Sequence, residues 1–193
     1  MSQRGQIQLA AGASLPVALT LWFALRHALP PIAANPMPFA LKLAGAALFL
    51  AFLPVIEAVA HERLMSPAID PLAGKDSPRL IVNQRVLQNT LEQSLVFIPG
   101  LFLVAHYAGD LRAAAACAIL WVVGRWAFWI GYHIGPMWRG LGVFSLVLGL
   151  AMLGYGVGSF GYELAGWAGV ASLIGPYAAI ELYLFATLRR PPK

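Results

Sequence analysis

Three polar side chains share one face of a predicted helix near the middle of the chain. Arg85, Asn89 and Glu92 follow one another at intervals of four and three positions, so at about 100° per residue they form one stripe. Apolar residues, among them Leu91 and Leu95, flank the stripe. A guanidinium, an amide and a carboxylate in register can bind the charged and amide groups of a small polar molecule.

A second polar set lies on the following hydrophobic segment. Arg125, Phe128 and Tyr132 are spaced i, i+3 and i+7, which again places them on one helix face, and Arg139 follows after a Gly-Pro break. Two antiparallel neighbouring helices can present both sets to the same space. We therefore expect both sets to line a common polar cleft.

These residues also allow a purely structural interpretation. Glu92 would pair with Arg125, and the other polar side chains would extend to the membrane interface. However, three arginines in the two sets face one carboxylate. The surplus positive charge suits an anionic ligand better than a closed network of ion pairs.

The segments that carry these residues have the composition of membrane helices. Hydrophobic residues make up 60% of the 193 residues and charged residues 11%, against roughly 45–50% and 25% in soluble domains. Apolar runs of about twenty residues can cross a hydrocarbon core of about 30 Å as helices. We predict an all-α integral membrane protein with six segments: 9–28, 39–63, 80–107, 111–134, 139–158 and 163–188.

The first segment has two interpretations, a retained helix or a signal peptide. Arg26 and His27 directly follow its apolar run, and no clean small-x-small cleavage site adjoins it. These features favour a retained helix.

Basic residues predict the orientation of the six spans. If the loop 64–79 is cytoplasmic, nine of the 13 Lys and Arg residues lie inside, three outside and one, Arg125, within a span. The inside set is Arg4, Arg63, Lys75, Arg79, Arg85, Arg139, Arg189, Arg190 and Lys193. The positive-inside rule then predicts that both termini are cytoplasmic.

Several other functions are excluded or disfavoured. The net charge of +5 includes no dense basic run with interleaved aromatic residues, so we expect no nucleic-acid partner. The four histidines lack ligand spacing, which predicts no metal site, and the single Cys117 excludes an intrachain disulfide and should pack against a neighbouring helix. Gly156 to Gly161 fits G-x-G-x-x-G, but it ends a membrane span and not a strand. Glu57 and His61, at i and i+4, are expected to form a local pair.

The combined spacing resembles that of the MAPEG family, the membrane-associated proteins of eicosanoid and glutathione metabolism. It consists of Arg85-x-x-x-Asn89-x-x-Glu92, then Arg125-x-x-Phe128-x-x-Gly131-Tyr132, then Arg139. The resemblance covers about 40–160, which is four of the six helices. It implies a four-helix bundle with an extra N-terminal and an extra C-terminal transmembrane helix. The corresponding divisions are 1–37 for the first helix and linker, 38–160 for the MAPEG-like domain, and 161–193 for the last helix and basic tail.

The resemblance also implies a homotrimer that binds glutathione as co-substrate in a cleft between neighbouring subunits. The implied glutathione-binding residues are Arg85, Asn89, Glu92, Arg125, Phe128, Tyr132 and, from the neighbouring subunit, Arg63. Arg139 would be the catalytic residue, placed beside the sulfur, because a nearby cation lowers the pKa of a thiol. The chain departs from some members at Phe128 and Gln93, where those members have tyrosine.

The expected function is that of a membrane-embedded transferase or peroxidase-like enzyme. It would join glutathione or another thiol to a lipophilic electrophile that enters from the membrane lipid, or use the thiol to reduce it. A non-catalytic membrane binder or scaffold is the alternative, because Phe128 lacks a hydroxyl and the chain has two extra helices. A small transporter is a third possibility, although no inverted repeat stands out.

Overall fold

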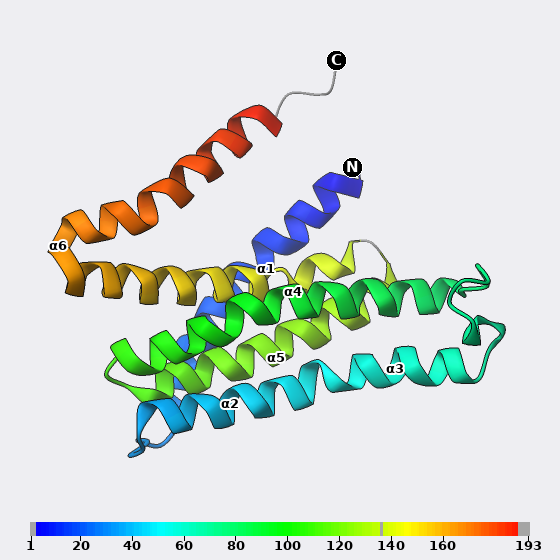
Figure 1. The fold of residues 1–193 in the computed structure, drawn as a ribbon, viewed down its shortest axis with the longest axis horizontal. Helices are drawn as coiled ribbons and strands as arrows, with labels where there is room; N and C mark the ends of the chain where they lie inside the picture. The colour runs from blue at the N-terminus through cyan, green and yellow to red at the C-terminus, as the bar shows by residue number, and fades with distance from the viewer. Residues whose placement is uncertain (1–2, 136, 189–193) are drawn as a thin grey trace.

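The computed structural model describes residues 3–135 and 137–188, and this part of the chain is helical with no strand. The long helices are connected by short segments that contain two 3-10 turns (Figure 1). In chain order the elements are α1 (Gln3–Ala28), α2 (Pro36–Ala51), α3 (Leu53–Leu64), η1 (Pro67–Ile69), α4 (Pro78–Tyr107), α5 (Leu111–Ile134), η2 (Trp138–Gly142) and α6 (Phe144–Leu188). The prediction of an all-α membrane fold is confirmed.

Three of the six predicted segments differ in detail from the observed helices. The segment 39–63 is divided into α2 and α3 at Phe52, because Pro54 at the start of α3 has no N–H for the helical ladder. The segments 139–158 and 163–188 form η2 and α6. α6 reverses at Ala165–Gly166, which lies inside the second of these segments and not between them. Gly166 has a φ of 58°, a conformation that glycine adopts readily.

The core lies where α2, α4, α5 and the first part of α6 meet. Alanines on the inner faces of α2 and α5 allow the helices to approach closely. Trp121 of α5 is fully buried and stacks on Phe97 of α4, with ring centroids 4.2 Å apart. Small residues around one large stacked pair therefore determine the spacing of the bundle.

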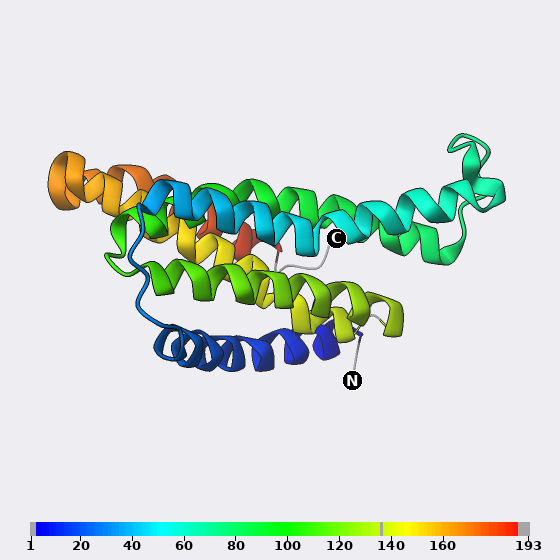
Figure 2. The ribbon, with the colours of Figure 1, turned by 90° about the horizontal axis from the view of Figure 1, so that it is seen from below.

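α1 and the second half of α6 lie outside this core. Figure 2 shows α1 alongside α5, on the opposite side from α2 and α3, and Figure 1 shows the second half of α6 diverging from the bundle. Hydrogen bonds and close packing attach α1. Trp22 Nε1 donates to Cys117 Sγ at 3.2 Å, and Arg26 Nε donates to Asp110 Oδ2 at 3.0 Å. α1 also packs on η2, so closely that a Cβ on Gly140 would lie 2.8 Å from Ile7 O. The buried Cys117 thus packs against a neighbouring helix, as predicted.

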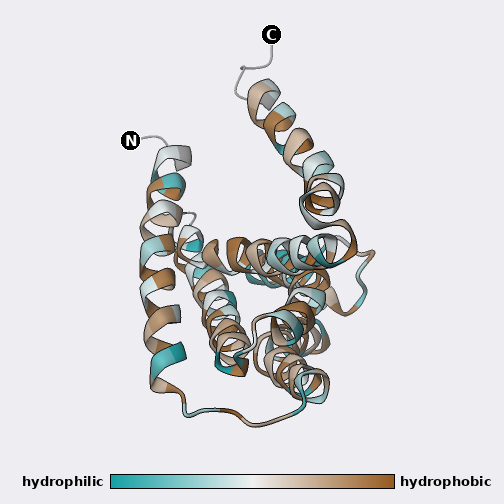
Figure 3. Cartoon of the chain, turned by 90° about the vertical axis from the view of Figure 1, so that its left-hand side faces the viewer, coloured by the Kyte–Doolittle hydropathy of each residue, from teal (hydrophilic) through white to brown (hydrophobic). Residues whose placement is uncertain are grey.

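Four helical stretches within the described residues are long and apolar enough to cross a membrane: Gly5–Ala28, Pro36–Leu64, Leu111–Ile134 and Trp138–Thr187. Hydrophobic positions run along each long helix, including both terminal ones (Figure 3). The fourth stretch has 50 residues, about 75 Å of helix, so its reversal at Ala165–Gly166 divides it into two lengths that each suit a bilayer. α4 has 30 residues and is long enough to cross a membrane, but it carries the polar stripe and is not among the four apolar stretches.

Candidate functional site

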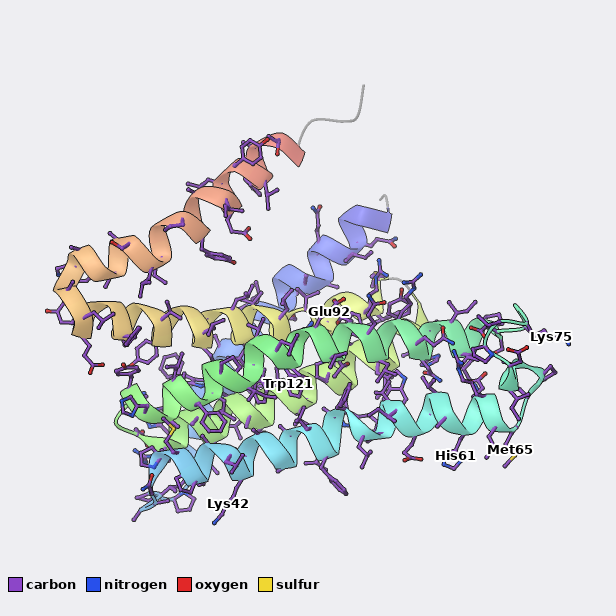
Figure 4. The ribbon with its side chains drawn as sticks, in the orientation of Figure 1. Lys42, His61, Met65, Lys75, Glu92 and Trp121 are labelled. Carbon is purple, nitrogen blue, oxygen red and sulfur yellow. The ribbon has the colours of Figure 1, made fainter. Side chains whose placement is uncertain are left out.

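The Arg85–Asn89–Glu92 stripe lies on the outside of the helix bundle. Arg85 and Glu92 are exposed and Asn89 is half-buried. Figure 4 shows Glu92 at the edge of α4 that faces away from α2 and α3. Glu92 accepts one hydrogen bond, from Gln88 Nε2 at 3.1 Å, and no hydrogen bond or ion pair of Arg85 occurs within the described parts of the chain. The stripe therefore leaves its two ionic groups open to a ligand or a second subunit.

The second set forms a continuous stack along α5. The guanidinium carbon of Arg125 lies 4.6 Å from the ring centroid of Phe128. The Phe128 and Tyr132 rings meet edge to face at 5.6 Å, and the Arg139 guanidinium carbon lies 5.1 Å from the Tyr132 ring. The order is cation, ring, ring, cation. The predicted common face of Arg125, Phe128 and Tyr132 is confirmed, and Arg139 joins it at the far end.

Glycines hold Arg139 in this position. A Cβ on Gly131 would collide with the backbone of Trp138 and Arg139, and a Cβ on Gly142 would collide with Phe128. The 3-10 turn η2 therefore packs directly on the last turns of α5. Because Arg139 lies in η2, this backbone contact places its guanidinium beside Tyr132.

Arg125 does not face the same space as the stripe. Its side chain is buried, and its Nε and Nη2 donate to Thr90 Oγ1 at 3.2 and 2.8 Å. Its Nη1 is buried without a hydrogen-bond partner within the described residues. The expected single cleft with Arg125 on its wall is therefore not formed within one protomer, and the alternative Glu92–Arg125 ion pair is wrong.

A chain of hydrogen bonds links the stripe to the start of α6. Gln93 Nε2 donates to Asn89 Oδ1 at 3.2 Å, and Ser145 Oγ donates to Gln93 Oε1 at 3.0 Å. Ser145 follows η2, the element that carries Arg139. Ser145 Oγ also donates to Gly142 O at 2.8 Å, so Gln93 and Ser145 connect the stripe to η2. The position of Gln93 four residues after Asn89 could have indicated its bond to Asn89, whereas no sequence pattern indicates Ser145.

Arg63 lies at the end of α3, in its last turn. Its side chain is half-buried, and its Nε is buried without a hydrogen-bond partner in the part of the chain that is described. Within one protomer, no hydrogen bond or ion pair of Arg63 with the stripe or with Arg139 is recorded. The nearby Glu57–His61 pair forms as predicted, at 3.1 Å.

A pocket with several polar residues in its wall lies on another side of α4, and the sequence did not indicate it. It has a volume of about 650 Å³ between α3, α4 and α5. Asn83 is buried at its wall, and Asn83 Oδ1 lies 2.8 Å from both Trp129 Nε1 and His133 Nε2. Asn83 is two residues before Arg85, about 160° around the helix from it, so this pocket is separate from the stripe. Three helices contribute to it, and no single-segment motif could indicate it.

Comparison with known proteins assigns the chain to a family. A family model described as the MAPEG family matches residues 39–158, more than half of the chain. The matched region contains the stripe, the cation–aromatic stack and Arg139, while α1 and the second half of α6 lie outside it. Among curated proteins and solved structures, none matches the chain. The chain belongs to the MAPEG family, which has an all-helical membrane fold.

Proposed function

We propose that this protein is a membrane-embedded, glutathione-dependent or other thiol-dependent enzyme of the transferase or peroxidase-like type, acting on a lipophilic electrophile. The observation that carries the proposal is the exposure of Arg85 and Glu92 on α4. Glu92 is the fifteenth of 30 residues in this helix. An ionised group at that depth of a membrane helix is unfavourable by roughly 2.5–3.5 kcal/mol when it faces lipid. A charged tripeptide bound there would remove this penalty.

Arg139 is the proposed catalytic residue. It is half-buried and fixed against Tyr132 by the contact of η2 with α5. A cation beside a thiol favours the thiolate. A thiol with a pKa of about 8.5 ionises at neutral pH after only a modest lowering of that pKa. The thiol proton would pass to solvent water, and the thiolate sulfur would form a bond to the electrophile, either adding to it or displacing its leaving group. No general base is needed.

The proposed assembly is a homotrimer with the thiol site between subunits. The outward direction of the stripe supports this arrangement, because a neighbouring protomer can cover it. The half-buried Arg63, whose Nε has no partner within the described chain, would contribute from that neighbour. Arg125 would then support the site from inside through Thr90.

The proposal is tested by substituting Arg139 in the purified protein. We expect Arg139→Ala to abolish the ultraviolet thiolate absorbance of bound glutathione, whereas Arg139→Lys, which keeps a positive charge, retains part of it. Thermal unfolding should show that both variants fold. Unchanged thiolate absorbance in Arg139→Ala would refute the assigned role.

A non-catalytic binder is the second candidate, and Phe128 favours it. The Phe128 ring is in the cation–aromatic stack but offers no hydroxyl to a ligand. Turnover of a generic electrophile with glutathione distinguishes the two functions. Turnover supports the enzyme, whereas glutathione binding without turnover supports the binder.

The proposed orientation places both termini in the cytoplasm. Arg26 and Arg112 meet at Asp110, which agrees with their assignment to the same, outer side. The side chain of Arg4 and residues 189–193 lie outside the described residues. Reporter fusions at each terminus test the orientation, and opposite sides for the two termini would exclude six crossings.

A further inference from the structure

A second cavity lies between α1, α5 and α6, away from the stripe and from Arg139. Its volume is about 510 Å³, within the usual range for small-molecule sites. Its wall is almost entirely apolar and includes Leu19, Trp22, Cys117, Leu120, Leu148 and Ala151. α1 forms one side of the cavity and lies outside the family match, so the region 39–158 alone does not form it.

The cavity has the length of one acyl chain. On α1 it extends from Leu15 to Arg26, and on α6 from Phe144 to Tyr155. Each stretch spans eleven residue steps, or about 16 Å of helix. A hydrocarbon core is about 30 Å thick, so the cavity is as long as one leaflet is deep.

One end of the cavity carries positive charge. Arg26 lines the cavity and shares Asp110 with Arg112, at 3.0 Å in both cases. Two guanidinium groups and one carboxylate leave one uncompensated positive charge. The Arg26 side chain keeps 35% of its surface exposed, so it can contact a further anion.

From this geometry we propose that the cavity binds a single-chain amphiphile with an anionic headgroup. The apolar chain lies along Trp22 and Cys117, and the headgroup contacts Arg26. Such a ligand fills the space between α1 and the bundle and attaches α1 to it. The site does not depend on the thiol chemistry proposed above.

Photo-crosslinking of the full chain in phosphatidylcholine nanodiscs tests this site. The probe is palmitic acid with a mid-chain diazirine, ionised at the pH of the experiment. α5 contains its own control, because Cys117 is buried at the cavity wall whereas Ile119 is exposed on the outside. We expect labelling at Cys117 to be suppressed at least tenfold by excess palmitic acid, while labelling at Ile119 is unchanged.

Substitutions test the contact of the headgroup with Arg26 and the contact of the chain with the cavity separately. Arg26→Gln is expected to reduce the labelling of Cys117 at least tenfold, and Arg26→Lys to retain it. Lys42→Gln is the matched control, because Lys42 is an exposed basic residue of α2 that does not line the cavity. Ala151→Phe fills the cavity and should abolish labelling in a protein whose unfolding temperature is retained.

Three results would overturn the proposal. Labelling of Cys117 that palmitic acid does not suppress would show general contact with lipid. Equal suppression by hexadecanol, which has the same chain without the charge, would exclude the headgroup site. Equal labelling by a diazirine phosphatidylcholine would identify a two-chain membrane lipid as the occupant.

Discussion

On the inward face of α4, Thr90 and Gln93 are buried and bonded to other helices, whereas on the outward face Arg85 is exposed and has no hydrogen bond or ion pair among the described residues. Both faces are polar and belong to the same helix. A buried polar group is unfavourable unless it is hydrogen-bonded, and the inward groups meet this requirement within one chain. The outward groups need a partner from elsewhere. We therefore expect the inward face to determine stability and the outward face to determine binding.

The largest effect on stability is expected from Thr90, on the inward face. Thr90→Val removes the hydroxyl that accepts both hydrogen bonds from Arg125. Hydrogen bonds to charged groups contribute about 1.5–3 kcal/mol, so the free energy of unfolding should fall by that amount. Thr90→Ser keeps the hydroxyl and is the control. Thermal unfolding of the detergent-solubilised protein measures both, and equal unfolding temperatures would show that this bond contributes nothing.

The contact between α5 and η2 links stability to the position of Arg139, and two glycines test it. Gly131→Ala places a methyl group against the backbone of Trp138, and overpacking of this kind is unfavourable by about 1–3 kcal/mol. Gly135→Ala is the matched control, because its Cβ would meet its nearest atom only at 3.9 Å. We expect Gly131→Ala alone to lower both the unfolding temperature and the thiolate absorbance. If the two variants have the same unfolding temperature and thiolate absorbance, the packing of η2 on α5 does not position Arg139.

The outward face should give the opposite pattern, with binding lost and stability kept. Arg85→Gln and Glu92→Gln are each expected to weaken glutathione binding about tenfold, or about 1.4 kcal/mol. Neither substitution should lower the free energy of unfolding by more than about 0.5 kcal/mol, because neither side chain bonds to another helix within the described residues. Leu95→Ala, 71% exposed on the same helix, is the control for binding. Titration calorimetry measures affinity, and a variant that loses stability without losing affinity would contradict the contrast between the two faces.

Helix faces were predictable from the sequence, but contacts between helices were not. The spacing of Arg125, Phe128 and Tyr132 gave their common face correctly, because one helix has a fixed angle per residue. The same rule cannot tell which neighbour Arg125 meets, and that neighbour is Thr90, on a different face from Arg85. At the reversal of α6 at Ala165–Gly166, the backbones of Gly161 and Gly169 touch. No turn motif indicates this contact between residues eight positions apart.

The ion pairs of Asp110 lie near the N-terminus of α5 and are partly exposed, whereas the hydrogen bonds at Thr90 are buried. We therefore expect Asp110 to contribute less than Thr90 to the free energy of unfolding. Its hydrogen bond from Arg112, and then that from Arg26, lowers the pKa of the carboxyl well below its ordinary value. The carboxylate therefore stabilises the fold fully above the unfolded-state pKa of about 3.9. This contribution falls as the pH drops below that value. Asp110→Asn should lower the unfolding temperature slightly at neutral pH, and its difference from the wild type should disappear in acid.

Asp70→Asn is the control, because Asp70 accepts a bond from Leu72 N and forms no ion pair with an arginine within the described residues. A difference between Asp110→Asn and the wild type that stays constant between pH values of about 7 and about 3 would mean that the ion pairs of Asp110 do not hold α1 on the bundle. The Trp22–Cys117 contact, the packing of α1 on η2 at Gly140 and the apolar wall of the cavity would then do so.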